Sequence, residues 1–300
     1  SYTGDESTTP ADLHDAAGAK ERELRHSLEA FHGRQDPKAL DAAWPHLDSE
    51  DRALHYAARI AVEAQPVAVW KQRALSEKRP EASLTALLAL ARCGPKEVQP
   101  ELLAALARLP LGTLPEDRQL EKLRVLQLTF IRQGPPAAGG AKKAAAELDA
   151  EFPNKNEMVN REIAQILIYL RAPHVAGKCL RLAAEAKTQE DELFYVYVLR
   201  TLPIGNWTMP QRKEYFGYFT KDHKRPPHSP ELVQWFADAG RPYGDGASFP
   251  NYMKHIFAEA TANLSDAERK ELAPLLTSID QASVVNYVTK VLPPIKEYKT

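Results

Sequence analysis

The chain has 300 residues, 44% of them hydrophobic and 26% charged, which is ordinary for a protein that buries a substantial core. Its 39 basic and 40 acidic side chains leave a formal charge of -1, so no global field favours nucleic acid or an anionic membrane. No apolar run reaches membrane-spanning length, and the two cysteines, Cys93 and Cys179, are too few for a disulfide framework or a zinc knuckle. We expect no membrane insertion, and we expect both cysteines to be buried and not bonded to each other.

The N-terminal part of the chain predicts an arm followed by amphipathic helices. Residues 1–12 are small and polar without periodicity, which indicates an extended arm. Helices are expected over residues 13–32 and 37–47, the first closed by Gly33. Another helix is expected to begin at Ser49. It contains small residues that would let a neighbouring helix approach closely, namely Ala57, Ala58 and Ala61.

Helix pairs then follow one another at a regular spacing. Residues 81–93 pair with 98–109 and residues 117–133 pair with 142–152, while the glycine-rich loop 134–141 is the expected flexible point. Helix starts are expected about thirty to forty residues apart, a spacing typical of helix-pair repeats. These starts lie near Ser49, Pro80, Pro115, Asn154 and Thr188. Because no pair can bury its apolar stripe alone, stacking on the adjacent pairs would supply a continuous core.

The clearest helical pattern covers residues 154–202, which we interpret as three short helices. Asn154 and Glu157 have the spacing of a capping box, and Pro173 ends the helix that they begin. Thr188 caps the third helix, which is apolar nearly all round and is therefore expected in the interior of the stack.

The pattern loosens after residue 202. Two further capping boxes are expected, Thr208 with Gln211 and Ser265 with Glu268. A last helix is predicted over residues 281–292. We assign 13–202 to regular repeats, 203–292 to an irregular part of the same stack and 293–300 to an exit linker. The expected fold class is all-α: an α-solenoid of stacked antiparallel helix pairs that becomes irregular towards the C-terminus.

No chemical motif accompanies this architecture. The nine histidines show no zinc-ligand spacing, and we interpret His55 and His174 as structural residues beside apolar helix faces. His223 and His228 flank a proline-rich basic loop that could hold a phosphate or a carboxylate of a partner, although a solvated loop explains them more simply. The glycines of residues 240–250 follow no strand and precede no P-loop lysine. The sequence therefore predicts no catalytic, cofactor-binding or metal-ligating residues.

Aromatic density is the strongest functional signal. Of the 24 Phe, Trp and Tyr residues, 14 lie between Phe194 and Phe257. If exposed, they would form a docking or sugar-stacking surface, and if buried they would only enlarge the core. The candidate interaction surface consists of Trp207, His223, His228, Trp235, Tyr243 and Tyr252.

With these residues laid out, the chain resembles the HEAT-like helical region of large extracytoplasmic proteins of planctomycetes and verrucomicrobia. In that family a sugar-dehydrogenase-like β-propeller precedes the helices and a c-type cytochrome domain follows them. The resemblance covers nearly the whole chain and is carried by packing and capping residues. The segments that carry it are residues 24–47, 54–63, 152–173, 188–202 and 207–219.

The resemblance implies a HEAT-like solenoid in a periplasmic or extracellular protein. The haem attachment signature C-x-x-C-H of the family is absent here, because Gly94 and Pro95 follow Cys93, while Leu180 follows Cys179. Haem c is therefore expected only in a neighbouring domain, and no cofactor is expected in this chain.

The implied function is a non-catalytic scaffold that docks neighbouring domains or another protein. The alternative is a carbohydrate- or peptide-binding module that uses the aromatic loops of residues 207–252. A hydrolase or lyase on an all-helical fold would need a carboxylate pair in a deep cleft, which sequence alone does not place. The oligomeric state stays open.

Overall fold

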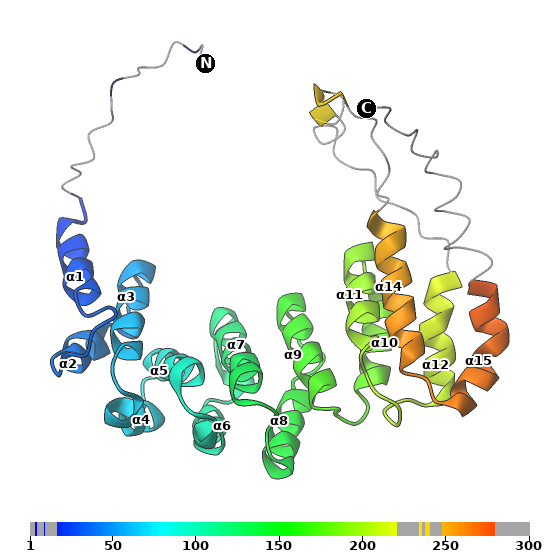
Figure 1. The fold of residues 1–300 in the computed structure, drawn as a ribbon, viewed down its shortest axis with the longest axis horizontal. Helices are drawn as coiled ribbons and strands as arrows, with labels where there is room; N and C mark the ends of the chain where they lie inside the picture. Colours follow the sequence, from blue (N-terminus) through cyan, green and yellow to red (C-terminus); the bar gives the residue numbers. More distant parts are fainter. Residues whose placement is uncertain are drawn as a thin grey trace, which may run out of the picture. The chain divides into compact units, whose positions relative to one another are not determined.

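The computed structural model describes residues 4, 9, 17–220, 234, 235, 238–240 and 248–279 (Figure 1). Every regular element in these ranges is a helix, which confirms the all-α prediction, and the ranges contain no β-strand. The predicted exit linker and the helix predicted over 281–292 lie outside the described residues, as does all of the N-terminal arm except residues 4 and 9.

The chain divides into two compact units. Unit 1 comprises the described residues of 1–114 and 124–137, and unit 2 comprises those of 115–123 and 138–300. One helix, α7 (Glu116–Gln133), contributes residues to both units. The boundary that we predicted at residue 202 stays a prediction.

Unit 1 consists of two sets of helices that pack alternately. Helices α1, α3 and α5 follow one another in contact, α4 contacts α6, and α4 and α6 both contact α5 (Figure 1). Short 3-10 turns over Trp44–His46, Lys96–Val98 and Leu111–Thr113 connect or extend these helices. The helices are α1 (Ala19–Glu29), α2 (Ala39–Ala43), α3 (Arg52–Glu63), α4 (Val67–Ser76), α5 (Pro80–Cys93), α6 (Gln99–Leu106) and the second part of α7.

Small side chains explain how closely these helices approach. Ala57, Ala58 and Ala61 of α3 are at most 1% exposed and face the contacts with neighbouring helices, as predicted. Helix α5 is buried on almost every side, so its sequence is apolar nearly throughout. Trp70 of α4 is fully buried, and its indole Nε1 donates to the Gln65 carbonyl at 3.1 Å.

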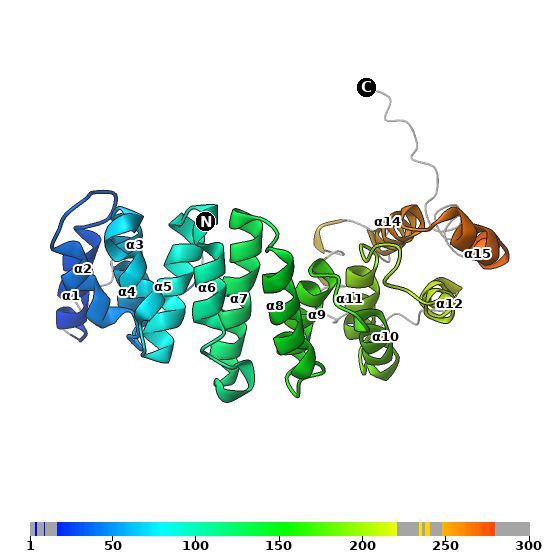
Figure 2. The same ribbon diagram turned by 90° about the horizontal axis from the view of Figure 1, so that it is seen from below.

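Unit 2 repeats the same alternation. Helix α9 contacts α8, α10 and α11, while α10 also contacts α11 and α12. The last helices pack on these, α14 on α11 and α15 on α12, and Figure 2 shows them from another side. The helices are the first part of α7, α8 (Ala138–Ala150), α9 (Glu157–Tyr169), α10 (Val175–Glu185), α11 (Gln189–Leu199), α12 (Met209–Gly217), α14 (Ser248–Ala262) and α15 (Asp266–Ile279), with a 3-10 turn over Tyr218–Thr220.

Three predicted helix caps are confirmed. The hydroxyl of Thr188 accepts the Asp191 backbone N–H at 3.2 Å. Both capping boxes form, because side chain and backbone satisfy each other in each pair. The two capping boxes are Thr208 with Gln211 and Ser265 with Glu268.

Three predicted helix starts are wrong. The cap of α9 is Asn156 rather than Asn154, because the Asn154 backbone and the Asn160 amide are bonded to each other in both directions, at 2.6 and 2.9 Å. Helix α3 begins at Arg52 rather than at Ser49, because Asp51 is its cap and accepts two backbone N–H groups. The loop predicted over 134–141 is shorter, since α8 already begins at Ala138.

Two glycines give opposite predictions for replacement by alanine. A Cβ on Gly94, just past α5, would lie 2.5 Å from the Leu90 carbonyl oxygen and 3.0 Å from Val98, whereas a Cβ on Gly139 in α8 meets nothing within 4 Å. We expect Gly94→Ala to destabilise the protein by about 1–3 kcal/mol, as overpacking does. The matched change Gly139→Ala should stabilise it by about 0.5–1 kcal/mol. Urea unfolding followed by circular dichroism measures both, and equal effects would contradict the packing described at Gly94.

Candidate interaction surface

The structure places the predicted aromatic residues in different surroundings. Trp207 is half-buried, its Nε1 donates to the Leu202 carbonyl at 3.0 Å, and its ring lies 4.5 Å from the Arg212 guanidinium and 5.3 Å from the Tyr215 ring. These contacts make Trp207 part of the packing at the start of α12. His223, His228 and Tyr243 lie outside the described residues.

Trp235 and Tyr252 are the exposed members of the predicted set, at 59% and 40%. The Tyr252 ring stacks on Tyr197 with centroids 5.6 Å apart, and the Arg200 guanidinium lies 3.6 Å from the Tyr197 ring centroid. Tyr252 therefore joins α14 to α11, and it presents only part of its ring to solvent. Trp207 and Tyr252 therefore pack against different helices of unit 2, and the candidate interaction surface as a whole stays a prediction.

The aromatic side chains at the end of α12 form a core instead. Their rings meet one another mostly edge to face, at centroid distances between 5.3 and 6.2 Å. Burial raises the pKa of the Tyr215 phenol, whose hydroxyl donates to the Val196 carbonyl at 3.0 Å, so the group stays neutral. For these residues the interpretation as core is confirmed. The cluster comprises Tyr215, Phe216, Tyr218, Phe219 and Phe257.

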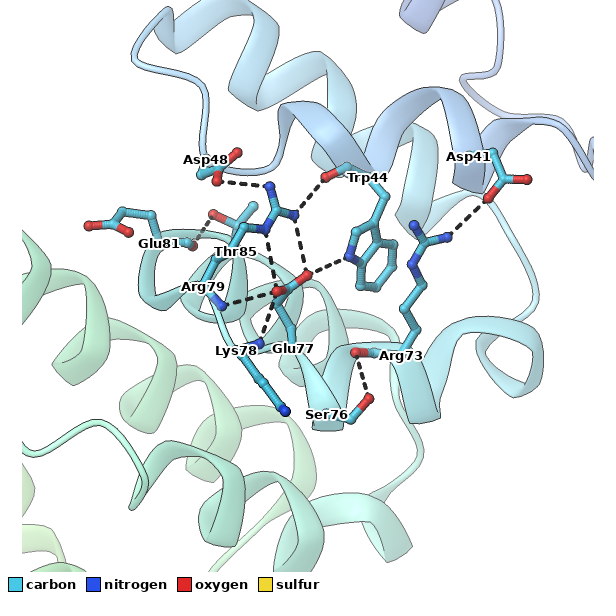
Figure 3. A network of polar contacts seen from close by, with 10 residues as sticks. All are labelled: Asp41, Trp44, Asp48, Arg73, Ser76, Glu77, Lys78, Arg79, Glu81 and Thr85. Carbon is cyan, nitrogen blue, oxygen red and sulfur yellow. Dashed lines mark hydrogen bonds and ion pairs between the residues drawn. The ribbon is translucent and has the colours of Figure 1, made fainter.

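The densest polar network of unit 1 surrounds the carboxylate of Glu77 in the turn between α4 and α5 (Figure 3). Glu77 accepts hydrogen bonds from the Trp44 indole at 2.7 Å and from the backbone and side chain of Arg79. The Arg79 guanidinium also donates to Asp48 at 2.9 Å and to the Trp44 carbonyl at 3.2 Å. Arg73 covers the Trp44 ring at 4.4 Å. The network fixes the segment after α2 onto the next helix pair.

This network predicts a stability that depends on pH. Burial alone would raise the pKa of Glu77, but the hydrogen bonds from Arg79 and Trp44 favour the carboxylate and lower the pKa from 4.5 to about 2. A lowered folded-state pKa contributes stability above pH 4.5 and loses it as the pH falls towards 2. We expect the stability difference between the wild type and Glu77→Gln to shrink across this interval in urea titrations. A difference that stays constant from pH 5 to pH 2 would contradict it.

The histidines and cysteines follow the predictions in part. His55 is structural, since its Nε2 lies 2.5 Å from the Thr85 hydroxyl on the adjacent α5. His174 is exposed just before α10, with a φ of 68°, so the prediction that it lies beside an apolar helix face is wrong.

The two cysteines differ in burial. Cys179 is buried, and burial raises the pKa of its thiol to about 12. Cys93 is exposed, so its predicted burial is wrong, because α5 presents its last turn to solvent. Both thiols are free.

A second polar cluster lies at the C-terminal ends of α3, α5 and α7 in unit 1. Glu63 receives an ion pair from Arg59 on its own helix and another from Arg92 of α5, the latter at 2.8 Å. Gln133, at the end of α7, donates to the Leu90 carbonyl of α5 at 3.3 Å, which holds the two helix ends together. We call Arg59, Glu63, Arg92 and Arg132 the arginine edge.

Sequence reasoning missed the arginine edge, although a signal for it exists. The ends of α5 and α7 share the pattern Arg-x-Gly-Pro, over residues 92–95 and 132–135. Aligning these two segments would have placed Arg92 and Arg132 at equivalent positions. The ion pairs to Glu63 depend on how α3 and α5 are aligned side by side, which the pattern does not give.

The described ranges contain no group of three or more His, Cys, Asp or Glu side chains arranged to hold a metal ion. Within the same ranges, none of the helices combines the length and the apolar composition that crossing a bilayer requires.

Comparison of the chain with protein-family models, with curated proteins and with solved structures finds no match.

Proposed function

We propose that this chain is a non-catalytic helical-repeat scaffold, an α-solenoid that docks neighbouring domains or another protein. The observation that supports it most is a series of polar contacts between segments of the chain that lie 29 to 33 residues apart, about the length of one helix pair. In unit 1 these are Trp44 with Glu77, His55 with Thr85, and Glu63 with Arg92; in unit 2 they are Asp149 with Lys178, and Arg161 with Asp191.

The ends of successive helices give further support. In each of four helices an arginine in or just after the last turn is followed, two or three residues later, by a proline. Proline ends a helix and arginine interacts favourably with the terminal carbonyls, so the pattern marks the same point of each repeat. The four arginines are Arg92 of α5, Arg132 of α7, Arg171 after α9 and Arg200 after α11.

The groups with shifted pKa values also favour a structural role. Shifted pKa values cluster at catalytic sites in many enzymes, but ion-pair networks shift them too. Burial lowers the pKa of Lys122 on α7, which pairs with Glu147 of α8. Burial likewise lowers the pKa of Arg212 on α12, which pairs with Glu268 of α15 at 3.1 Å. Each of these cations holds two helices together, as Glu77 holds α4 and α5 to the preceding segment.

The resemblance extends this proposal to a specific context. It implies a periplasmic or extracellular protein in which the helices dock a dehydrogenase-like propeller against a c-type cytochrome domain. The haem then belongs to the neighbouring domain, and this chain contributes the surface that binds both domains and keeps them apart. Stacked helix pairs suit that task because they offer a long, stiff surface.

The test is a calorimetric titration of this chain with separately produced segments that flank it in its native polypeptide. Saturable binding to either segment, absent with an unrelated helical protein of similar charge, supports a docking scaffold. Variants at exposed apolar side chains then locate the surface, Tyr56→Ala for unit 1 and Trp235→Ala for unit 2. A flat titration with both segments would contradict docking to neighbouring domains.

The exposure of Trp235 favours one alternative, a carbohydrate- or peptide-binding module. A glycan array followed by titration distinguishes it from the scaffold. Saturable binding that Trp235→Ala abolishes, with an unchanged helical circular dichroism spectrum, would favour the binding module. Trp207→Phe is the matched control, because Trp207 is engaged with Arg212 and Tyr215.

A further inference from the structure

The arginine edge combines a local positive charge with exposed apolar side chains. It contains three arginines and one glutamate, whereas the whole chain carries a formal charge of -1. Arg59 and Arg92 both pair with Glu63, and Arg132 directly precedes Gln133, which donates to the Leu90 carbonyl two residues before Arg92, so the three arginines lie around one point of unit 1. The edge is therefore a compact cationic site on a chain that is otherwise nearly neutral.

The three arginines differ in solvent exposure and in the ion pairs that they already form. The side chains of Arg59 and Glu63 are only 11% and 10% exposed, so this pair forms the base of the edge. Arg92 is 41% exposed and keeps part of its guanidinium open although it contacts Glu63. Arg132 is exposed and makes no hydrogen bond or ion pair with any residue that the structure describes. Arg132 and Arg92 are thus the groups that a ligand reaches.

Two exposed apolar side chains accompany these cations, one in contact with Arg59 and one next to Arg132 in the chain. Tyr56 is 58% exposed on α3, and the Arg59 guanidinium covers its ring at 5.1 Å, which holds the ring in place. Ile131, the residue before Arg132 on α7, is 72% exposed. Tyrosine is a residue type enriched at protein interfaces, so Tyr56 can serve as an apolar anchor beside the arginines.

We propose that the arginine edge docks a short acidic segment of a partner protein, with carboxylates on Arg132 and Arg92 and an apolar residue beside Tyr56 or Ile131. Arginine recognises carboxylates through paired hydrogen bonds, and clusters of arginine are a common way to bind acidic motifs. A nucleic acid fits less well, because it needs an extended basic surface and only Arg92 and Arg132 of the edge are exposed. The proposal rests on the proposed docking function and names the chemistry of one partner.

The test uses the full chain and a fluorescein-labelled peptide that contains four glutamates around one leucine, with fluorescence anisotropy as the readout. We expect saturable binding that weakens as salt is added, since screening reduces attraction between exposed charges. A peptide with glutamine in place of every glutamate should bind at least tenfold more weakly. Arg132→Gln should weaken binding about tenfold, the loss of one charge-assisted interaction, and Arg132→Glu should abolish it.

Arg124→Gln is the matched control, because Arg124 is an exposed arginine on the same helix, about 12 Å away along the axis. It removes the same charge and should change the affinity less than twofold. Equal losses for Arg132→Gln and Arg124→Gln, or equal binding of the glutamine peptide, would overturn the proposal. Tighter binding of a single-stranded oligonucleotide than of the peptide would also overturn it. If the peptide fails while a flanking segment binds, the scaffold function stands and only the acidic partner is rejected.

Discussion

Replacing Arg212 by methionine will lower the free energy of unfolding by about 3 kcal/mol, as expected when one partner of a buried ion pair is removed. The Arg212 side chain is 1% exposed and donates to Glu268 at 3.1 Å and to the Asn263 carbonyl at 2.7 Å. Methionine keeps most of the packing volume under Trp207 but leaves the Glu268 carboxylate, 15% exposed, without its cation. The contact between α12 and α15 would lose its main polar connection.

Lys213→Met is the control for this prediction. Lys213 is the next residue, and it also pairs with α15, through Glu271 at 2.8 Å, but both side chains are more than half exposed. Exposed ion pairs contribute about 0–1 kcal/mol, so this variant should unfold almost like the wild type in urea. Equal destabilisation by both variants would show that burial of the Arg212 pair does not determine its contribution.

Glu77→Ala should destabilise unit 1 by about 2–3 kcal/mol, because each buried donor left without an acceptor costs about 1–3 kcal/mol. The change removes the acceptor of the indole of Trp44, which is 3% exposed, of the partly buried backbone N–H of Arg79 and of the exposed backbone N–H of Lys78. It also frees the Arg79 guanidinium from one of its two carboxylates. Urea unfolding followed by Trp fluorescence measures the loss.

Asp41→Ala is the matched control in the same region. Asp41 pairs with Arg73 at 3.1 Å, yet its side chain is 88% exposed, so its removal should cost no more than about 0.5 kcal/mol. If Asp41→Ala destabilised the protein as much as Glu77→Ala, the network in Figure 3 would not act through its buried carboxylate.

Local signals explain why the helices could be predicted. Proline and caps fix helix ends within the chain itself, so α5 begins at Pro80 and α12 follows Thr208 as expected. Asn154 and Asn156 are equally good caps by residue type, and only the bonds that Asn160 makes with Asn154 decide between them. Such a choice depends on a contact across a turn, which periodicity does not encode.

The interaction surfaces were harder to predict from the sequence than the helices. Aromatic density predicted an interaction surface, but the same composition also fits a core, and Tyr215 and Phe216 are buried while Trp235 is exposed. The arginine edge depends on Arg92 meeting Glu63 across two helices. That contact requires α3 and α5 to lie side by side, and their relative position is established only by tertiary packing.

Hydrogen exchange of wild type and Arg212→Met, measured by mass spectrometry under native conditions, distinguishes a repeat scaffold from a single cooperative globule. In a stack of repeats each pair depends mainly on its neighbours, so local destabilisation stays local. We predict faster exchange in α12, α14 and α15 and unchanged exchange in α8 of the same unit, as well as in α3 and α5 of unit 1. Equal acceleration in all helices, the signature of a single cooperative globule, would show that the helices do not form a stack of repeats.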